Sequence, residues 1–548
     1  MANNKFFKIT RTAAEKLTGA EKGHLGDQFE VSEWYSTGRY SVDKDEEKSQ
    51  RLLKNVEENL CSKRPYFTNL DIANFKGIRK FRNRIRLDPH LNVFVGINGS
   101  GKTTILEALV RVSSWIVNGI RTQGQGKHID LIEINNSSDV RECAISATLS
   151  LDDESDFSIK LYKNLNSNSR TRSELTAFRN LSAMYQYVNS ENSEASPLPI
   201  FAYYSVGRSQ EIKKEEYDKA ELTTFNKLDG YHKSFDESGN FKDLTDWLII
   251  HNAESSSEIN SSIIRFNELQ AVHENTKRMF SLLSDDLKDE SDIGRSLTSD
   301  LKEQKEEIIE LENKLKNSDT EVVRIVKYAI SCFLDISNIR LEITSESVRI
   351  MLDKNGISIP ATALSQGEKA LFSLISDISR RMVLLNPNKG KDALKGNGVI
   401  FIDELELHLH PKWQQQVIFK LKDVFPNIQF ILTTHSPQVL TTVPHYCIKV
   451  LEGDTQGTIS ITEPDFSLGA ESNLLLEEIF LVSSRPEDAE EVRILERYKE
   501  LVRNDKWDSE EAMQLLPEIE KWGRNYDPVV RQLQMDVRLR QYRRGSKQ

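Results

Sequence analysis

Residues 91–116 read LNVFVGINGSGKTTILEALVRVSSWI, which is a hydrophobic run, a glycine-rich loop and an amphipathic helix. The loop matches the pattern GxxxxGK[ST], and its glycines let backbone N–H groups turn toward phosphate oxygens at a helix N-terminus. Lys102 is expected to reach the β and γ phosphates, and the Thr103 hydroxyl to ligate Mg²⁺. A glycine-rich turn with a chance lysine is the alternative, which the strand before it and the helix after it disfavour. We therefore expect a nucleoside triphosphate to be bound by Gly96, Asn98, Gly99, Ser100, Gly101, Lys102, Thr103 and Thr104.

Three further motifs follow in order along the chain. LSQGEKALFSLI (364–375) places a serine and a glycine at a helix start, where a hydroxyl and backbone N–H groups can meet an anion. VIFIDELELHLHP (399–411) leads an apolar strand into Asp403, expected to hold Mg²⁺, and Glu404, expected to polarise the attacking water. TTHS places His435 at the end of another strand, where its imidazole can meet the γ-phosphate.

Taken together, NFKGIRK, GINGSGKT, LSQGEKALF, VIFIDELELHLHP and TTHSP resemble the motifs of ABC-type ATPase heads of the SMC and RecF class. That resemblance implies two heads that sandwich ATP and Mg²⁺, and hence at least a homodimer. It implies that Ser365, Gln366, Gly367 and Glu368 act in trans, that Lys76 lies near the nucleotide, and that His408 and His410 belong to a loop at the dimer interface. A zinc site at His408 and His410 is the less favoured alternative. Three weak candidates for the Q-loop of this class are Gln123, Gln125 and Asn136.

A narrower resemblance rests on DELELHLHP, LPIFAYYSVGR, FKDLTDWLI and the tail segments NLLLEEIF, RPEDAE and AMQLLPEIEKWGRNYDPVV. Over roughly residues 66–535 the chain is similar to PtuA, the ATPase subunit of Septu anti-phage systems, including those that accompany retrons. PtuA works with an HNH endonuclease, PtuB. The resemblance implies that this chain controls such a nuclease. In a retron it implies a reverse transcriptase and its multicopy single-stranded DNA (msDNA) as further partners.

Parts of the sequence are also compatible with other functions. Related ATPases of the OLD family carry a TOPRIM nuclease, and VLEGDTQG (450–457) offers the start of one at Glu452, but no Asp-x-Asp pair follows. We therefore expect no nuclease domain in the chain. A DNA-binding repair ATPase of the RecF or SMC kind is the second candidate. An ABC transporter motor is disfavoured by the long insertion between Lys102 and Ser365.

The expected fold is α/β: an ABC-type P-loop head with a mixed sheet, a helical insertion and a helical C-terminal region. The insertion contains Leu297, Leu301, Gln304, Ile308, Leu311 and Leu315 at heptad spacing, which favours either a short helical hairpin or an ordinary amphipathic helix. Residues 163–195, rich in Asn and Ser, are expected to loop out, and 447–453 and 457–463 to form edge strands. The expected domains are an N-terminal extension (1–65), a P-loop lobe (66–208), a helical insertion (209–335), a second lobe (336–469) and a helical region (470–548).

Composition sets further limits. The net charge of −11 opposes a wholly nucleic-acid-binding surface, although eight cations between Lys63 and Arg86 could bind phosphates or simply face solvent, as could the basic tail. The four cysteines form no CxxC pair, which disfavours a disulfide framework or a structural zinc site. No run approaches the roughly 20 apolar residues of a membrane span, and the N-terminus lacks the apolar core of a secretion signal. We expect a cytoplasmic protein without a membrane partner.

Overall fold

The computed structural model describes residues 11–137, 139–152, 155–165, 171–191, 196–209, 226–235, 244–245, 247–248, 257–281, 292–316, 320–343, 348–524 and 526–545. The chain forms two compact units, Met1–Gly469 and Ala470–Gln548. No helix among the described residues is long and apolar enough to span a bilayer.

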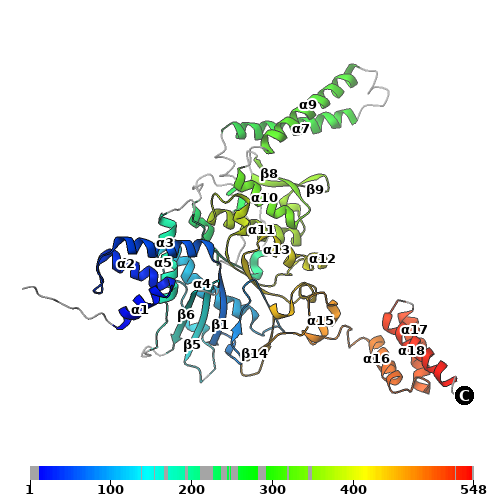
Figure 1. The fold of residues 1–548 in the computed structure, drawn as a ribbon. Coiled ribbons are helices and arrows are strands. Elements are labelled where there is room, and N and C mark those ends of the chain that lie inside the picture. Colours follow the sequence, from blue (N-terminus) through cyan, green and yellow to red (C-terminus); the bar gives the residue numbers. More distant parts are fainter. Residues whose placement is uncertain are drawn as a thin grey trace, which may run out of the picture. The chain divides into compact units, whose positions relative to one another are not determined.

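An eleven-stranded mixed sheet is the centre of the first unit (Figure 1). Its strands are β1 (Pro65–Phe75), β2 (Ile78–Phe81), β3 (Ile85–Arg86), β4 (Leu91–Val95), β5 (Glu142–Leu151), β6 (Ser155–Asn164), β7 (Ile200–Tyr204), β11 (Gly398–Ile402), β12 (Ile428–Thr433), β13 (Ile448–Gly453) and β14 (Thr458–Thr462). They lie in the order β6-β5-β1-β2-β14-β13-β4-β12-β11-β7, with β3 paired to β1. The α/β fold with a mixed sheet is as predicted.

Parallel pairing brings the functional motifs to one edge of this sheet. Strands β4, β12, β11 and β7 run parallel to their neighbours, and every residue in them is buried. Nearly continuous apolar runs of this kind, interrupted here by Asn92 in β4 and by Gln429 and Thr433 in β12, are typical of strands covered on both faces. The P-loop follows β4, the Asp403-Glu404 pair follows β11 and His435 follows β12, so all three lie at the carboxyl edge.

Two sequence-based expectations about the sheet and its cover are wrong. Strands β13 and β14 are not edge strands, because β13 pairs with β4 and β14 pairs with β2 inside the sheet. Residues 163–195 contain the helix α5 (Thr176–Glu191), whose apolar residues Phe178, Leu181 and Val188 are buried at helical spacing. That helix packs against α4 (Lys102–Thr122), the helix that follows the P-loop.

The N-terminal extension is helical and packs on the head. It consists of α1 (Arg11–Glu21), α2 (Leu25–Thr37) and α3 (Glu46–Ser62). Helices α2 and α3 both contact α5, and these helices lie side by side in Figure 1. Ala13, Ala20, Val31 and Trp34 form a small apolar cluster of their own.

The insertion holds α7 (Ser257–Ser281) and α9 (Asp292–Lys316), which pack against each other. Gln304 of α9 donates to the Thr276 hydroxyl of α7 at 3.4 Å, so the helical hairpin is the alternative that the structure adopts. The side chains of Leu311 and Leu315, and most of FKDLTDWLI, lie outside the described residues.

The predicted insertion ends with α10 (Glu321–Phe333). The second lobe then begins with a small antiparallel sheet, in which the turn at residues 355–356 joins two strands. Its elements are β8 (Ser337–Ile343), β9 (Val348–Lys354), β10 (Ile357–Pro360), α11 (Gln366–Leu385), α12 (Pro411–Gln414), α13 (Val417–Val424) and α14 (Pro437–Leu440).

The second unit is helical, as predicted for this part of the chain. It contains α15 (Ser472–Glu478), α16 (Glu490–Arg503), α17 (Glu510–Gly523) and α18 (Pro528–Gly545). Leu495 and Tyr498 of α16 pack with Ile519 of α17 and Val530 of α18 in one apolar core.

Candidate nucleotide-binding and hydrolysis site

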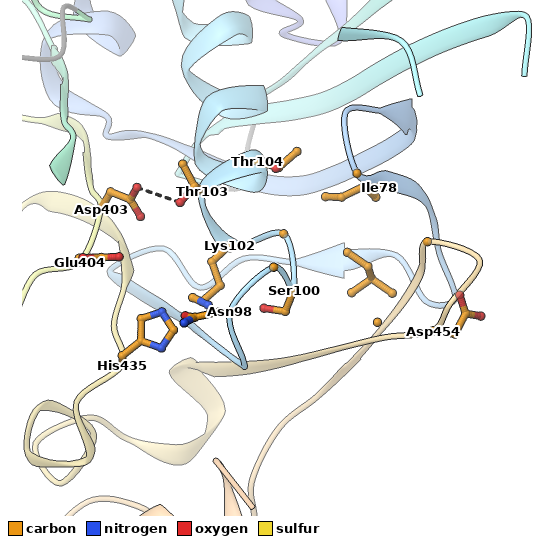
Figure 2. A pocket seen from close by; sticks show the side chains of 16 residues that line it. Ile78, Asn98, Ser100, Lys102, Thr103, Thr104, Asp403, Glu404, His435 and Asp454 are labelled. Atoms are coloured by element: carbon orange, nitrogen blue, oxygen red, sulfur yellow. Dashed lines mark hydrogen bonds between the residues drawn. The ribbon is translucent and has the colours of Figure 1, made fainter. Parts of the chain in front are cut away.

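A cavity of about 440 Å³ lies over the P-loop at the carboxyl edge of the main sheet (Figure 2). Residues from five separate segments line it: Gly77, Ile78, Asn98, Gly99, Ser100, Gly101, Lys102, Thr103, Thr104, Asp403, Glu404, His435, Gly453, Asp454, Gly457 and Ile459. The structure therefore brings together eight of the residues predicted to bind nucleotide or metal with both predicted catalytic residues.

The P-loop needs glycine at its two ends. Gly96 has φ +152° and a Cβ there would lie 2.6 Å from the Leu451 carbonyl oxygen. Gly101 has φ +95°, and a Cβ there would lie 3.0 Å from Ile459. At both positions a side chain would push the loop away from the β13–β14 hairpin.

Lys102 lies folded over this loop. Its ammonium donates to the carbonyl oxygens of Gly96 at 3.0 Å and Ile97 at 2.9 Å. Burial lowers the pKa of Lys102, although the nearby Asp403 and Glu404 carboxylates act in the opposite direction. A phosphate placed in the loop would give this buried cation a stronger partner than backbone carbonyls.

Ser100 offers a direct test of whether the loop suits a phosphate. Its hydroxyl is buried and has no hydrogen-bond partner among the described residues. Buried hydroxyls are nearly always paired, so the orphan on the cavity wall fits a site shaped for a polar ligand.

A hydrogen bond joins Thr103 and Asp403, which lie about three hundred residues apart in the sequence. The Thr103 hydroxyl donates to Asp403 Oδ2 at 2.9 Å, the dashed contact in Figure 2. Two ligands at about 2.0–2.1 Å from Mg²⁺ and at right angles to each other lie roughly 2.9 Å apart. The hydroxyl and the carboxylate therefore fit adjacent positions in an octahedral magnesium shell.

Thr433 holds both carboxyl residues of the second motif. Its hydroxyl donates to Asp403 Oδ1, and it accepts the backbone N–H of Glu404 at 2.8 Å. Glu404 has a φ of +46°, a left-handed conformation that is unfavourable for a residue with a side chain. The two hydrogen bonds of Thr433 stabilise this turn, and the turn places the Glu404 side chain on the cavity wall.

Glu406 positions the histidine. Its carboxylate accepts the backbone N–H of His435 and, at 2.6 Å, the hydroxyl of Thr434. The His435 side chain then lies on the same side of Lys102 as Asp403 and Glu404, as Figure 2 shows. Glu406 and Thr433 lie inside two of the quoted motifs, VIFIDELELHLHP and TTHS, but the sequence reasoning placed Glu406 only with the interface loop and gave Thr433 no role.

The residues on the opposite side of the cavity were also not predicted from the sequence. Ile78 comes from the start of β2, and Asp454 and Ile459 come from the β13–β14 hairpin. Backbone N–H groups of Thr458 and Gln456 lower the pKa of Asp454. The only sequence signals here were turn residues, which do not reveal which site a turn borders.

The signature segment lies away from this cavity. None of the four signature residues is in its lining. The Ser365 hydroxyl donates to Glu368 at 2.9 Å and caps α11. Gly367 packs so tightly that a Cβ would lie 2.3 Å from the carbonyl oxygen of His408.

Lys76 and the histidine pair also lie elsewhere. Lys76 forms an ion pair with Glu107 of α4 and is not in the cavity lining. His410 caps α12, accepting from the Lys412 N–H at 3.3 Å. No group of three or more His, Cys, Asp or Glu residues suited to a metal occurs in the part of the chain that the structure describes, which leaves His408 and His410 without further zinc ligands there.

The three Q-loop candidates are not in the cavity lining either. Gln123 ends α4 in a left-handed conformation, Gln125 contacts His128 at 3.3 Å, and Asn136 follows the short turn 131–133.

Part of the basic cluster before the P-loop is paired with carboxylates. Arg64 contacts Asp152 at 3.4 Å, and Arg79 pairs with Asp139. Such pairing reduces the positive field available to phosphates at these positions.

Comparison with known proteins identifies the family. The family model described as "AAA domain, putative AbiEii toxin, Type IV TA system" matches residues 91–441. The "Retron Vc95 probable ATPase" of Vibrio cholerae serotype O1 biovar El Tor is 34% identical over 455 residues, which are 81% of this chain and 84% of that protein. The chain belongs to the retron-associated ATPases. The resemblance found in its motifs is confirmed.

Other proteins are similar to this chain over different lengths. The "Retron Ec83 probable ATPase" of Escherichia coli is 27% identical over 535 residues, 95% of each chain. The "Septu protein PtuA" of Bacillus mycoides (strain KBAB4) is 43% identical over 74 residues, 14% of this chain and 10% of that protein. Among solved structures, the Smc head domain of Pyrococcus furiosus bound to the C-terminal domain of ScpA has a TM-score of 0.38 and 16% identity, covering 73% of this chain and 96% of that one.

Proposed function

We propose that this ATPase is the regulatory subunit of an anti-phage defence complex, in which ATP binding and hydrolysis control a separate HNH endonuclease. The observation that carries the ATPase part is the single cavity shared by Lys102, Thr103, Asp403, Glu404 and His435. The retron and Septu names of the relatives support the defence context. In a retron, the reverse transcriptase and msDNA would be further partners.

Each residue of the cavity has a distinct task in hydrolysis. The P-loop N–H groups and Lys102 bind the triphosphate. Mg²⁺ held by Thr103 and Asp403 would neutralise charge on the β and γ oxygens. Glu404 accepts a proton from the attacking water, and His435 donates a hydrogen bond to the γ-phosphate.

The site is completed by a second copy of the chain. The signature residues cap and pack α11 rather than line the cavity of their own chain. We propose that Ser365 and Gly367 contact the γ-phosphate held by the partner chain, and that His408 and His410 lie at this interface. ATP would then stabilise a homodimer, whose assembly the nuclease would sense.

Glu404→Gln tests the hydrolytic role. We expect ATP hydrolysis to fall by at least about 100-fold, because the proton acceptor is lost, while ATP stays bound and the dimer persists. Hydrolysis is followed by phosphate release, and assembly by light scattering with ATP and Mg²⁺. Glu452→Gln, on the exposed end of β13, is the matched control and should behave as the native chain. A Glu404→Gln variant that neither retains nucleotide nor changes assembly would refute the assignment.

Reconstitution tests the regulatory role. The chain alone should leave nucleic acid intact, and cleavage should require an added HNH endonuclease of the PtuB kind. We expect that cleavage to change when Glu404→Gln replaces the native ATPase. Metal-dependent cleavage by the purified ATPase would contradict a division of labour between two subunits.

A further inference from the structure

Tyr204 is the last residue of β7, the strand that lies beside β11 at one end of the strand order of the main sheet. Parallel pairing sets Tyr204 opposite Ile402, the last residue of β11. Just beyond that pair, the Tyr204 carbonyl oxygen accepts the backbone N–H of Asp403 at 2.9 Å. The end of β7 therefore holds the main chain of Asp403, a residue of the nucleotide cavity lining.

The position of Asp403 depends on contacts with three different elements. Its carboxylate accepts the hydroxyls of Thr103 in α4 and Thr433 in β12, and its N–H is held by Tyr204 of β7. The two threonines contact the carboxylate, whereas Tyr204 fixes the backbone from which the carboxylate extends. Because Mg²⁺ requires near-ideal octahedral geometry with ligands at about 2.0–2.1 Å, a shift of this backbone would change how well the carboxylate fits the metal.

The side chain of Tyr204 is anchored to α11. Its buried hydroxyl donates to Asp377 Oδ2 at 2.8 Å. Burial and the nearby Asp377 carboxylate raise the pKa of Tyr204 well above its ordinary value, so the hydroxyl keeps the proton that it donates. A hydrogen bond to a charged acceptor is stronger than one between neutral groups. Tyr204 is thus fixed to α11 at its hydroxyl, while its carbonyl group holds Asp403.

Asp377 is itself held in place by further hydrogen bonds. Arg381 donates to its Oδ2 at 2.7 Å and Arg380 to its Oδ1 at 2.8 Å, and all three side chains are buried. Arg381 also donates to the carbonyl oxygens of Gly230 and His232, both at 2.8 Å. Networks of buried hydrogen bonds make the groups that form them rigid. Asp377 is therefore a fixed attachment point for the end of β7.

We propose that Tyr204 is a positioning residue for ATP hydrolysis, which keeps Asp403 in the geometry that binds Mg²⁺. The inference rests on the proposed function, because it takes Asp403 as a metal ligand. Tyr204 is not in the cavity lining, so it acts through Asp403 and not on the nucleotide. Loss of its hydroxyl would release the end of β7 from α11 and loosen the backbone of Asp403.

Two buried tyrosines form a matched pair for the test. Tyr204→Phe removes the hydroxyl but keeps the ring and both arginine contacts of Asp377. Tyr231→Phe is the control, because Tyr231 is also buried and its hydroxyl donates to the Pro199 carbonyl oxygen at 2.7 Å. Each variant loses one buried hydrogen bond, so a small and similar loss of thermal stability is expected in both. A purely structural role would affect metal binding equally in the two variants.

Metal binding is measured with Mn²⁺ as the probe, by electron paramagnetic resonance in the presence of the non-hydrolysable analogue AMP-PNP. We expect Tyr204→Phe to weaken Mn²⁺ binding about five- to twentyfold, near the lower end of the range for residues that orient metal ligands. Tyr231→Phe should bind Mn²⁺ as the native chain does. In phosphate-release assays, kcat of Tyr204→Phe should fall by a similar factor. Its KM for ATP should stay within about twofold of the native value, because the P-loop is unchanged.

A native Mn²⁺ affinity in Tyr204→Phe would overturn the proposal, and so would an equal loss in Tyr231→Phe. Asp403→Ala shows whether the proposed function itself is at fault. If Asp403→Ala binds Mn²⁺ with AMP-PNP as the native chain does, Asp403 is not a metal ligand and the assignment of the magnesium site fails. If Asp403→Ala loses Mn²⁺ and Tyr204→Phe does not, only the role of Tyr204 fails.

Discussion

At the scale of single residues, Lys102 shows why the loop is suited to bind a phosphate. The ammonium donates to two carbonyl oxygens of its own loop, and Lys102 as a residue is only 7% exposed. A buried cation held by neutral acceptors is less stable than one paired with an anion. Phosphate binding therefore relieves an unfavourable arrangement that the fold imposes.

This arrangement predicts a pH dependence for nucleotide binding. Burial lowers the pKa of Lys102, and a bound phosphate would raise it. As pH rises through the lowered pKa, Lys102 of the nucleotide-free protein loses a proton that binding must restore. Affinity should then fall by up to about tenfold per pH unit, with proton uptake. Calorimetry at pH 7 to 10 in buffers of different ionisation enthalpy measures both, and a pH-independent affinity would contradict this account.

Thr433 gives a second prediction at this scale. Thr433→Val keeps the shape of the side chain but removes the hydroxyl that joins Asp403 to the Glu404 backbone. We expect kcat for ATP hydrolysis to fall about 10- to 100-fold, as for other residues that orient metal ligands. Thr433→Ser should restore most of it. Equal loss in both variants would mean that packing, not the hydroxyl, matters.

Motif residues could be predicted from the sequence, but their positioning residues could not. Lys102, Asp403 and His435 each lie in a local pattern whose chemistry is specific, so their types and spacing were sufficient to propose a shared site. Thr433 and Glu406 act through hydrogen bonds between two strand ends. The register of β11 and β12 decides which atoms form hydrogen bonds there, and a local sequence pattern does not specify that register.

At the scale of elements, a buried ion cluster joins α11 to the sheet. Asp377 pairs with Arg380 at 2.8 Å and Arg381 at 2.7 Å, and accepts the Tyr204 hydroxyl at 2.8 Å. Tyr204 ends β7, and its carbonyl oxygen accepts the N–H of Asp403 at 2.9 Å. The helix that begins with the signature segment is thereby linked to the backbone of the hydrolysis site.

Removing the charge of Asp377 should be costly. Asp377→Asn leaves two buried guanidinium groups without their carboxylate, which predicts a loss of about 3–5 kcal/mol in the free energy of unfolding. Urea denaturation measures it. Glu33→Gln, which breaks an ion pair of two exposed side chains, should change stability little. Similar stability in the two variants would show that the cluster is not a stabilising link.

The same cluster predicts the direction of acid sensitivity. Burial would raise the pKa of Asp377, but Arg381 and Arg380 outweigh it and hold the pKa well below its usual range. The contribution of Asp377 is therefore complete above about pH 4, the ordinary pKa of an Asp in the unfolded chain. It is lost only as pH falls toward the lower folded-state pKa. Asp377→Asn should flatten this part of the curve of stability against pH.

Element positions were harder to predict than element types. The strands β13 and β14 were recognised, but their places beside β4 and β2 depend on pairings distant in sequence. Helix α5 was missed because the Asn and Ser residues around it suggested a loop. The spacing of Phe178, Leu181, Tyr185 and Val188 was the available signal, and it outweighs composition because those side chains are buried.

At the scale of the whole molecule, one chain does not bring all of its ATPase motifs to one place. The cavity contains the residues proposed to bind and hydrolyse ATP, whereas the signature segment of the same chain lies outside its lining. If a second copy supplies that segment, then the two sites of a dimer each depend on both chains. A defect in one motif should therefore be separable from a defect in the other.

Mixing two inactive variants tests this sharing. Lys102→Ala removes the phosphate ligand, and Ser365→Arg blocks the signature segment. In a dimer containing one chain of each kind, one site carries both defects and the other carries neither. Random pairing makes half of the dimers mixed, so about one quarter of the native hydrolysis rate should return if the sites act independently. Phosphate release by the mixture, compared with each variant alone, measures this. Because a site built within one chain would stay defective in every combination, the absence of recovery, with both variants folded and dimeric, would place the signature segment in cis.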